Sequence, residues 1–194
     1  MRNLTILIPA AGNATRMRGG DKLLELVHGQ PMLRHQALLA LTVTDTVLIT
    51  LRAPDPARTA ALHGLNVSQI LVPDAQTGMS ASLRRAGHIQ TALMILPADM
   101  PDLTRDDLAT LIAAHHDTPD LILRGASAAG QPGHPVILPA ALVPELATLQ
   151  GDEGARSLLQ RHPTRLIPLP GQHAITDLDT PEDWAAWRNS HPIW

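Results

Sequence analysis

Short apolar runs alternate with amphipathic stretches along the whole chain. Most of the runs are continuous rather than alternating, which is the pattern of strands covered on both faces. Strands that alternate with helices form parallel sheets layered between those helices. The sequence therefore predicts an α/β fold, three-layer and Rossmann-type, with a mostly parallel sheet and helices on both faces. The expected strands are 4–8, 47–51, 67–72, 92–96, 121–123, 136–138 and 166–169.

Three of the predicted helices have recognisable starts. Pro31 precedes a helix over 32–41, because the fixed φ angle of proline suits the first helical position. Thr104, with Asp107 three residues later, has the spacing of a capping box. The segment TPED at 180–183 marks the start of a last helix, which carries tryptophans.

The length of 194 residues predicts one domain spanning 1–194, and no repeat or convincing linker divides it. The glycine-rich segment 125–133 is expected to be the most mobile loop. No apolar run approaches the roughly 20 residues that cross a bilayer. The apolar stretch after Arg2 is brief and ends at Pro9, so we interpret it as a buried first strand rather than a secretion signal. We expect a cytoplasmic protein without a membrane partner.

Composition excludes several classes of protein. The chain has no Cys, which removes disulfides, thiolate zinc sites, iron–sulfur clusters and a cysteine nucleophile. It has no Phe or Tyr, and its three Trp all lie in the last eleven residues, which disfavours a platform for stacking bases. The net charge of −3 disfavours binding to a phosphate backbone. We expect no nucleic-acid partner.

The loop after the first strand, PAAGNATRMRGGDK at 9–22, concentrates candidate chemistry. Its small residues at 10–12 let the backbone approach a ligand, and Arg16, Arg18 and Lys22 place three positive charges within seven residues. Backbone N–H groups and cations between a strand and a helix favour an anion, most naturally a polyphosphate. Neither the P-loop spacing nor the dinucleotide fingerprint is present. A solvated surface loop with incidental arginines is the alternative.

Lys22 stands out because it is the only lysine among fifteen basic residues. A compact ammonium meets a phosphate differently from a planar guanidinium, so the exception can have a chemical reason. Asp99 stands out among the acidic residues, since it follows an apolar run and precedes Met100 and Pro101. A carboxylate at a strand end is placed to hold a hard cation such as Mg²⁺, and a turn or helix-cap Asp is the alternative.

The first loop resembles the signature loop of the MobA-like nucleotidyltransferases that build the molybdenum cofactor, A-A-G-x-S-x-R-M-G-x-x-K. Its PAAG resembles the cytidylyltransferase branch, whereas guanylyltransferases commonly carry L-A-G-G. Ala14, Arg18 and Ala98 depart from the family pattern, which often has Ser, Gly and Gly there. Further motifs resemble the family in the expected order: TGMSASL (77–83), LPADMP (96–101), GHPVIL (133–138), GDEGAR (151–156) and DLDTPED (177–183).

The resemblance implies transfer of CMP from CTP to a phosphate acceptor, a molybdopterin-type molybdenum cofactor, with release of pyrophosphate. It implies Mg²⁺ as cofactor, and a molybdoenzyme that receives the product is a further conceivable partner. The residues that it implies for catalysis are Lys22, Arg16 and Asp99. Those implied for nucleotide binding are Ala10, Ala11, Gly12, Arg16, Lys22, Asp74, Gly78 and Ser80.

Each residue proposed for the metal or the acceptor could instead have a purely structural role. The resemblance implies Asp99 and Asp179 as metal ligands, with Asp177 in reserve, although acidic residues here could simply stabilise the start of the last helix. His134 could orient the acceptor or serve in a turn, and Arg156 could meet an anionic pterin or cap a helix. Two rival functions remain: a sister enzyme acting on a sugar or polyol phosphate, and a binding protein without turnover.

Overall fold

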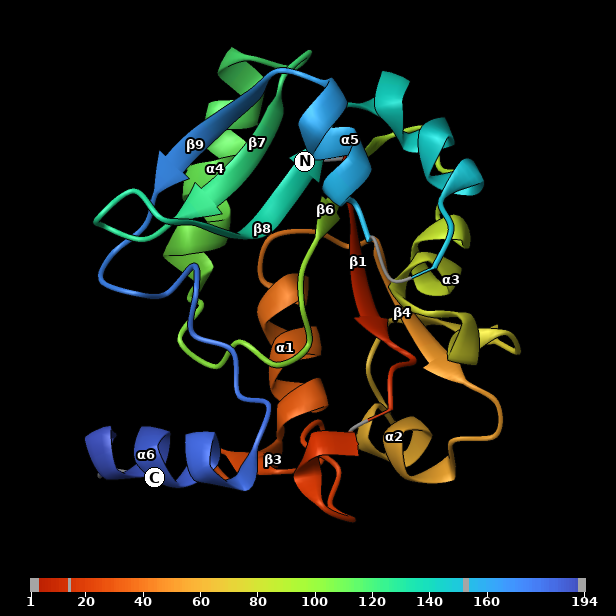
Figure 1. Ribbon diagram of the computed structural model, residues 1–194, viewed down its shortest axis with the longest axis vertical. Coiled ribbons are helices and arrows are strands. Elements are labelled where there is room, and N and C mark those ends of the chain that lie inside the picture. The colour runs from red at the N-terminus through yellow and green to blue at the C-terminus, as the bar shows by residue number, and fades with distance from the viewer. Residues whose placement is uncertain (1–3, 14, 152–153, 192–194) are drawn as a thin grey trace.

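A seven-stranded sheet forms the centre of the molecule. The computed structural model describes residues 4–13, 15–151 and 154–191 (Figure 1), so Ala14 and residues 152–153 of the GDEGAR motif lie outside the described residues. The strand order is β5-β4-β1-β6-β8-β7-β9, and only β8 runs antiparallel to its neighbours. The strands are β1 (Leu4–Ala10), β4 (Val47–Arg52), β5 (Ser68–Val72), β6 (Ala92–Ile95), β7 (Ile122–Ala126), β8 (Pro132–Leu138) and β9 (Thr164–Pro168).

Helices cover both faces of this sheet, and the mostly parallel α/β architecture expected from the sequence is confirmed. The central strand β1 shows why its sequence is continuously apolar. Ile6 and Ile8 pack into the core beneath α1 and α4, whereas Leu7 packs into a second core beneath α3, η3 and α5. The helices are α1 (Met32–Leu41), α2 (Pro56–Ala61), α3 (Met79–Arg84), α4 (Arg105–Asp117), α5 (Arg156–Arg161) and α6 (Pro181–Ser190), with 3₁₀ turns η1 (Thr15–Met17), η2 (Ala75–Thr77) and η3 (Ala140–Thr148).

A small hairpin of β2 (Leu26–Val27) and β3 (Gln30–Pro31) lies beside the C-terminal helix α6 at one end of the molecule (Figure 1). Trp184 and Trp187 of α6 pack there with Val27 and Met32. The expected capping box is present, with Thr104 and Asp107 at the start of α4, and the last helix α6 begins where the sequence predicts, with the same arrangement of Thr180 and Asp183. Within the described residues, no helix has the length and apolarity to cross a membrane.

The loop predicted over 125–133 is shorter in the structure, so the predicted bounds are wrong. Its outer residues belong to β7 and β8, and only 127–131 form the turn, which is closed by a hydrogen bond from the Ser127 N–H to the Gln131 carbonyl at 2.9 Å. Gly125 and Gly133 allow close packing, whereas Gly130 has a positive φ of 83° in the turn. A Cβ atom on Gly125 would collide with the backbone of His134.

Candidate functional site

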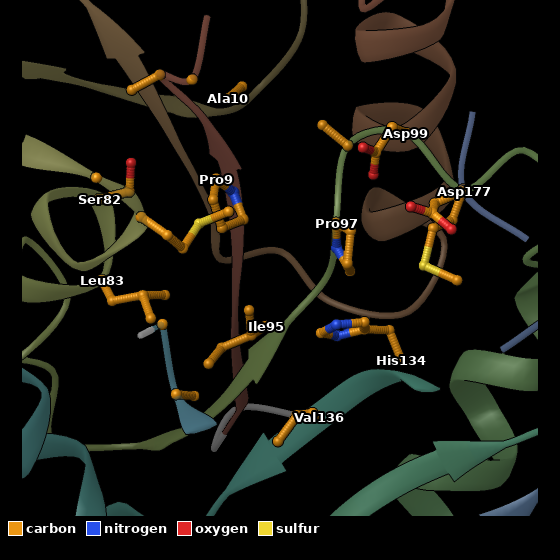
Figure 2. Close-up of a pocket in the computed structure, with 18 of the residues that line it drawn as sticks. Pro9, Ala10, Ser82, Leu83, Ile95, Pro97, Asp99, His134, Val136 and Asp177 are labelled. Carbon is orange, nitrogen blue, oxygen red and sulfur yellow. The ribbon is translucent and has the colours of Figure 1, made fainter. Parts of the chain in front are cut away.

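A cavity of about 1230 Å³ opens at the edge of the sheet where β1 and β6 end. Open parallel sheets bind ligands outside the carboxyl ends of their strands. Figure 2 shows Asp99 and Asp177 on one side of this cavity and Ser82 and Leu83 on the other. The His134 side chain projects from β8 on the side of the two aspartates.

Lys22 joins two distant parts of the chain beside this cavity. Its Nζ lies 2.5 Å from Asp99 Oδ2 and 2.5 Å from Asp179 Oδ1, across 77 and 157 residues of sequence. Arg16 Nη1 lies 2.6 Å from the other oxygen of Asp179. Lys22, Asp99, Asp179 and Arg16, which the sequence predicts as site residues, are thus the members of one network, although Asp179 is not among the residues that line the cavity.

The charge state of Lys22 follows from its surroundings. Burial by itself would lower the pKa of the Lys22 ammonium. The negative charge of Asp99 and the hydrogen bonds that Lys22 donates to Asp179 and Asp99 outweigh burial and raise that pKa. Lys22 is therefore a fixed positive charge at neutral pH. It can balance the charge of an anion but cannot act as a base.

Backbone contacts hold the loop that carries Asp99. Gln36 of α1, which is completely buried, donates from Nε2 to the carbonyls of Pro97 at 3.2 Å and Met100 at 2.8 Å. The Leu178 N–H donates to the Asp99 carbonyl at 3.1 Å. These bonds fix the backbone on both sides of Asp99, so its carboxylate is positioned before any ligand binds.

The acidic residues have the oxygen chemistry that a hard cation requires. Because Asp99 and Asp179 each contact the same nitrogen, their nearest oxygens are at most twice the 2.5 Å contact distance apart. Burial, then the charges of Asp179 and Asp99, raise the pKa of Asp177 nearby. Among the described residues, no group of three or more His, Asp or Glu could hold a metal by itself.

The nucleotide residues expected from the sequence divide into two sets. Ala10, Ala11, Gly12 and Gly78 line the cavity. Asp74 and Ser80 do not; Arg84 contacts both, at 2.7 Å from Asp74 Oδ2 and 3.0 Å from Ser80 Oγ. Residues two positions apart on a helix face different directions, and it is Ser82 that lines the cavity.

The two acceptor candidates, His134 and Arg156, both line the cavity. Burial and then the positive charge of Arg124 lower the pKa of His134 to about 4, so its ring is neutral near pH 7. His134 Nδ1 is buried and has no hydrogen-bond partner among the described residues. The neutral ring can therefore exchange a hydrogen bond with a ligand.

Arg18, one of the departures from the family pattern, turns away from the cavity. Its backbone has φ of 51°, a left-handed conformation that glycine adopts more readily. Its side chain pairs with Glu182 of α6 at 2.7 Å, and both groups are exposed. The third charge of the first loop therefore contacts the C-terminal helix rather than the cavity.

Sequence reasoning missed two arginines, Arg58 and Arg124, that line the cavity. Arg124 of β7 donates from Nε to the Gly133 carbonyl at 2.8 Å. Arg58 of α2 is completely buried and contacts the first loop. No local signal marks either residue, because an isolated arginine in a sequence is usually exposed.

Comparison with known proteins identifies relatives over nearly the whole chain. The family model of the MobA-like NTP transferase domain matches residues 6–166. The molybdenum cofactor guanylyltransferase of Pseudomonas aeruginosa (strain PAO1) is 32% identical over 187 residues, covering 92% of this chain and 91% of that protein. The molybdenum cofactor guanylyltransferase of Serratia proteamaculans (strain 568) is 28% identical, covering 95% and 94%.

Solved structures share the fold. Rv0371c from Mycobacterium tuberculosis H37Rv superposes with a TM-score of 0.81 at 25% identity, covering 97% of this chain and 98% of that one. Its complex with manganese gives a TM-score of 0.79 at 26% identity, with coverage of 97% and 99%. A CMP-2-keto-3-deoxy-manno-octonic acid synthetase complexed with CTP gives 0.77 at 16% identity, covering 98% of both chains, which shows the fold alone.

The curated relatives named here are guanylyltransferases, so they do not support the expected preference for CTP. They do support the coarser expectation that the chain is a nucleotidyltransferase. The family model covers most of the chain, and a relative above 30% identity spans nine tenths of it. The chain therefore belongs to the MobA-like NTP transferase family and is a nucleotidyltransferase.

Proposed function

We propose that this protein transfers a nucleotidyl group from a nucleoside triphosphate to the phosphate of a molybdopterin-type acceptor and releases pyrophosphate. The observation that carries the proposal is the contact of Lys22 with Asp99 and Asp179 at the edge of a cavity of about 1230 Å³. A site for one small molecule occupies roughly 300–1,000 Å³. The cavity therefore has room for a nucleotide beside the first loop and an acceptor beside His134.

The chemistry requires positioning and positive charge more than a covalent protein intermediate. The acceptor phosphate attacks the α-phosphorus in line, and negative charge grows on the non-bridging oxygens and on the departing pyrophosphate. Lys22 and Arg16 are cationic residues that line the cavity and are suited to neutralise that charge. His134 and Arg156 would hold the acceptor on the opposite side of the reacting phosphorus.

A divalent cation, Mg²⁺ by preference, would be held by Asp99 and Asp179. The ion would neutralise phosphate charge and polarise the phosphorus under attack. The solved relative Rv0371c in complex with manganese supports a divalent ion in this fold. Lys22 contacts one oxygen of each carboxylate and Arg16 contacts the other oxygen of Asp179, so an ion held by Asp179 would replace one of these two cations.

CTP is the nucleotide that we propose, because the segment PAAG at 9–12 resembles the cytidylyltransferase branch. Ala11 is buried against Val72 and Ala81, so its methyl group fills space that glycine would leave open. GTP is the second candidate, favoured by the names of the curated relatives.

Pyrophosphate release tests the proposal. Purified protein is incubated with Mg²⁺, a molybdopterin acceptor and CTP, GTP or ATP in turn, and then with sugar or polyol phosphates as acceptors. We expect turnover with molybdopterin and a preference for CTP. A preference for GTP overturns the cytidylyl assignment, and turnover only with a sugar or polyol phosphate overturns the acceptor. Thermal stabilisation by nucleotide without any turnover indicates a binding protein.

The variant Asp99→Asn tests the metal residue. We expect it to lower metal-dependent turnover on the order of 100-fold, because a neutral amide is a weak ligand for a hard cation. Asp106→Asn is the matched control, since Asp106 lies exposed on α4 away from the cavity. Equal activity in the two variants contradicts the role of Asp99.

A further inference from the structure

Arg58 of α2 is a buried arginine whose hydrogen-bonding capacity is nearly saturated. Nε and Nη2 form a two-pronged ion pair with the Asp21 carboxylate at 2.8 and 2.9 Å. Nη1 donates to the carbonyls of Ala10 at 2.6 Å and Gly12 at 3.0 Å. Four of the five N–H donors of a guanidinium are therefore in use, and the residue has no exposed surface.

These partners are the two ends of the first loop. Ala10 and Gly12 lie where the chain leaves β1, and Asp21 immediately precedes Lys22. One guanidinium thus closes the loop at its base. Closing a loop removes conformational freedom from every residue within it, so the entropy that ordering would cost on ligand binding is already lost in the free protein.

The carbonyl contacts also determine which backbone groups are available to an anion. In a planar trans peptide the C=O and the following N–H point in opposite directions. Because Arg58 attracts the carbonyls of Ala10 and Gly12, the N–H groups of Ala11 and Asn13 are directed away from the guanidinium. Both of these residues line the cavity. Without Arg58, either carbonyl could turn toward the cavity and repel a phosphate.

The ion pair with Asp21 extends the effect to Lys22. Asp21 Oδ1 also accepts a hydrogen bond from the Leu23 N–H at 3.0 Å, so the residues on both sides of Lys22 are fixed. Asp55, the N-cap of α2, accepts from the Arg58 N–H at 3.2 Å and lies 3.5 Å from Arg58 Nε. The Asp55 carboxylate therefore both caps α2 and helps to balance the buried positive charge of Arg58.

We infer that Arg58 is a positioning residue for nucleotide binding: it shapes the first loop and places Lys22 without contacting substrate. The inference rests on the proposed function for the identity of the ligand. The competing explanation is that Arg58 only attaches α2 to the rest of the protein. Arg34 of α1 supplies the comparison, because its Nη1 donates to the carbonyls of Ala61 at 3.0 Å and His63 at 2.9 Å, at the other end of α2.

The test compares Arg58→Lys with Arg34→Lys, well below the melting temperature of either variant. A lysine keeps the charge but cannot contact both ends of the loop at once. For Arg58→Lys we expect the nucleotide KM and the calorimetric Kd for the nucleotide with Mg²⁺ to rise on the order of tenfold or more, with the acceptor KM within about twofold. Arg34→Lys should keep the wild-type nucleotide KM and Kd, whatever its stability.

A variant of Asp21, the ion-pair partner of Arg58, tests the inference if Arg58→Lys does not fold. Asp21 is partly exposed, and Asp21→Asn retains one oxygen acceptor while it removes the charge. We expect Asp21→Asn to weaken nucleotide binding in the same direction. In the double variant the second substitution should add little, because both residues belong to one interaction.

Two results overturn the inference: a lowered melting temperature with wild-type nucleotide KM and Kd, or an equal rise in the KM values of nucleotide and acceptor. Failure of the proposed function is distinct, because it would show as a wild-type protein without turnover. In that case the calorimetric Kd for the nucleotide still decides the role of Arg58.

Discussion

At the scale of single residues, burial and neighbouring charges give similar side chains different properties. Lys22 keeps its charge although it is largely buried, because two carboxylates contact it. His134 is buried beside the positive charge of Arg124, and it loses its charge at a pH where an exposed histidine would still be partly protonated. The cavity therefore combines a fixed cation with a neutral imidazole among the residues that line it.

The low pKa of His134 predicts a pH dependence of stability. In the unfolded chain this histidine binds a proton below about pH 6.5, whereas in the folded protein it does so only below about pH 4. Between these values the unfolded state binds more protons, so stability falls as the pH falls through this window. We expect the free energy of unfolding of the wild type to lose up to about 3 kcal/mol more than that of His134→Asn between pH 7.5 and 4.5.

Urea unfolding at several pH values measures this difference. The two proteins are compared by their pH dependence rather than by absolute stability, because the substitution also changes packing. Parallel pH profiles for wild type and variant would show that His134 is not held neutral in the folded protein.

At the scale of elements, the start of α6 fixes the position of Asp179. The Asp183 carboxylate accepts hydrogen bonds from the backbone N–H groups of Thr180 at 2.8 Å and Asp179 at 3.1 Å. Thr180 Oγ1 accepts from the Asp183 N–H at 3.1 Å, which completes the capping box. A helix cap thus holds the backbone of a residue whose carboxylate contacts Lys22 and Arg16.

Removal of this cap has a predictable cost. Thr180→Ala leaves the Asp183 N–H without its side-chain acceptor, and we expect a loss of about 1 kcal/mol in the free energy of unfolding. Thr110→Ala is the control, since Thr110 lies exposed within α4 and caps no helix end. Chemical denaturation measures both variants, and an equal loss in the two would contradict the contribution of the cap.

At the scale of the whole molecule, the direction of β8 assembles the acceptor side of the cavity. Because β8 runs antiparallel to β6 and β7, its amino end lies beside their carboxyl ends. Gly133 and His134 therefore reach the edge of the sheet where Asp99 lies. The His134 N–H donates to the Ala174 carbonyl at 2.7 Å, which brings the segment before α6 against the start of β8.

This close approach predicts that Gly133 tolerates no side chain. A Cβ atom there would overlap the backbone carbonyl of Ala174, and backbone cannot move aside as a flexible side chain can. We expect Gly133→Ala to lower the free energy of unfolding by about 2 kcal/mol. Gly12→Ala is the stability control, because a Cβ atom there would meet nothing within 4 Å. Urea unfolding that gives the same midpoint for both variants would refute the expected collision.

The elements that the sequence pattern predicts are mainly the long or strongly apolar ones. All seven expected strands and the three expected helices are confirmed, with differences of a few residues at their ends. The short helices α2, α3 and α5 were not predicted. Each has six residues, which is too short to show helical periodicity. Neither α3 nor α5 has a side-chain cap at its start, whereas α2 begins with the signal Asp55–Pro56, which the sequence analysis did not use.

The sequence by itself determined the layered α/β architecture, the cationic loop after the first strand and the resemblance to the nucleotidyltransferases. These depend on local spacing and on short motifs. Only the tertiary structure decided that Lys22 contacts Asp99 and Asp179, that Arg58 closes the first loop, and that Arg84 contacts Asp74 and Ser80, neither of which lines the cavity. The physical reason is that such contacts depend on strand order, strand direction and helix packing, which bring together residues whose sequence neighbours give no sign of the encounter.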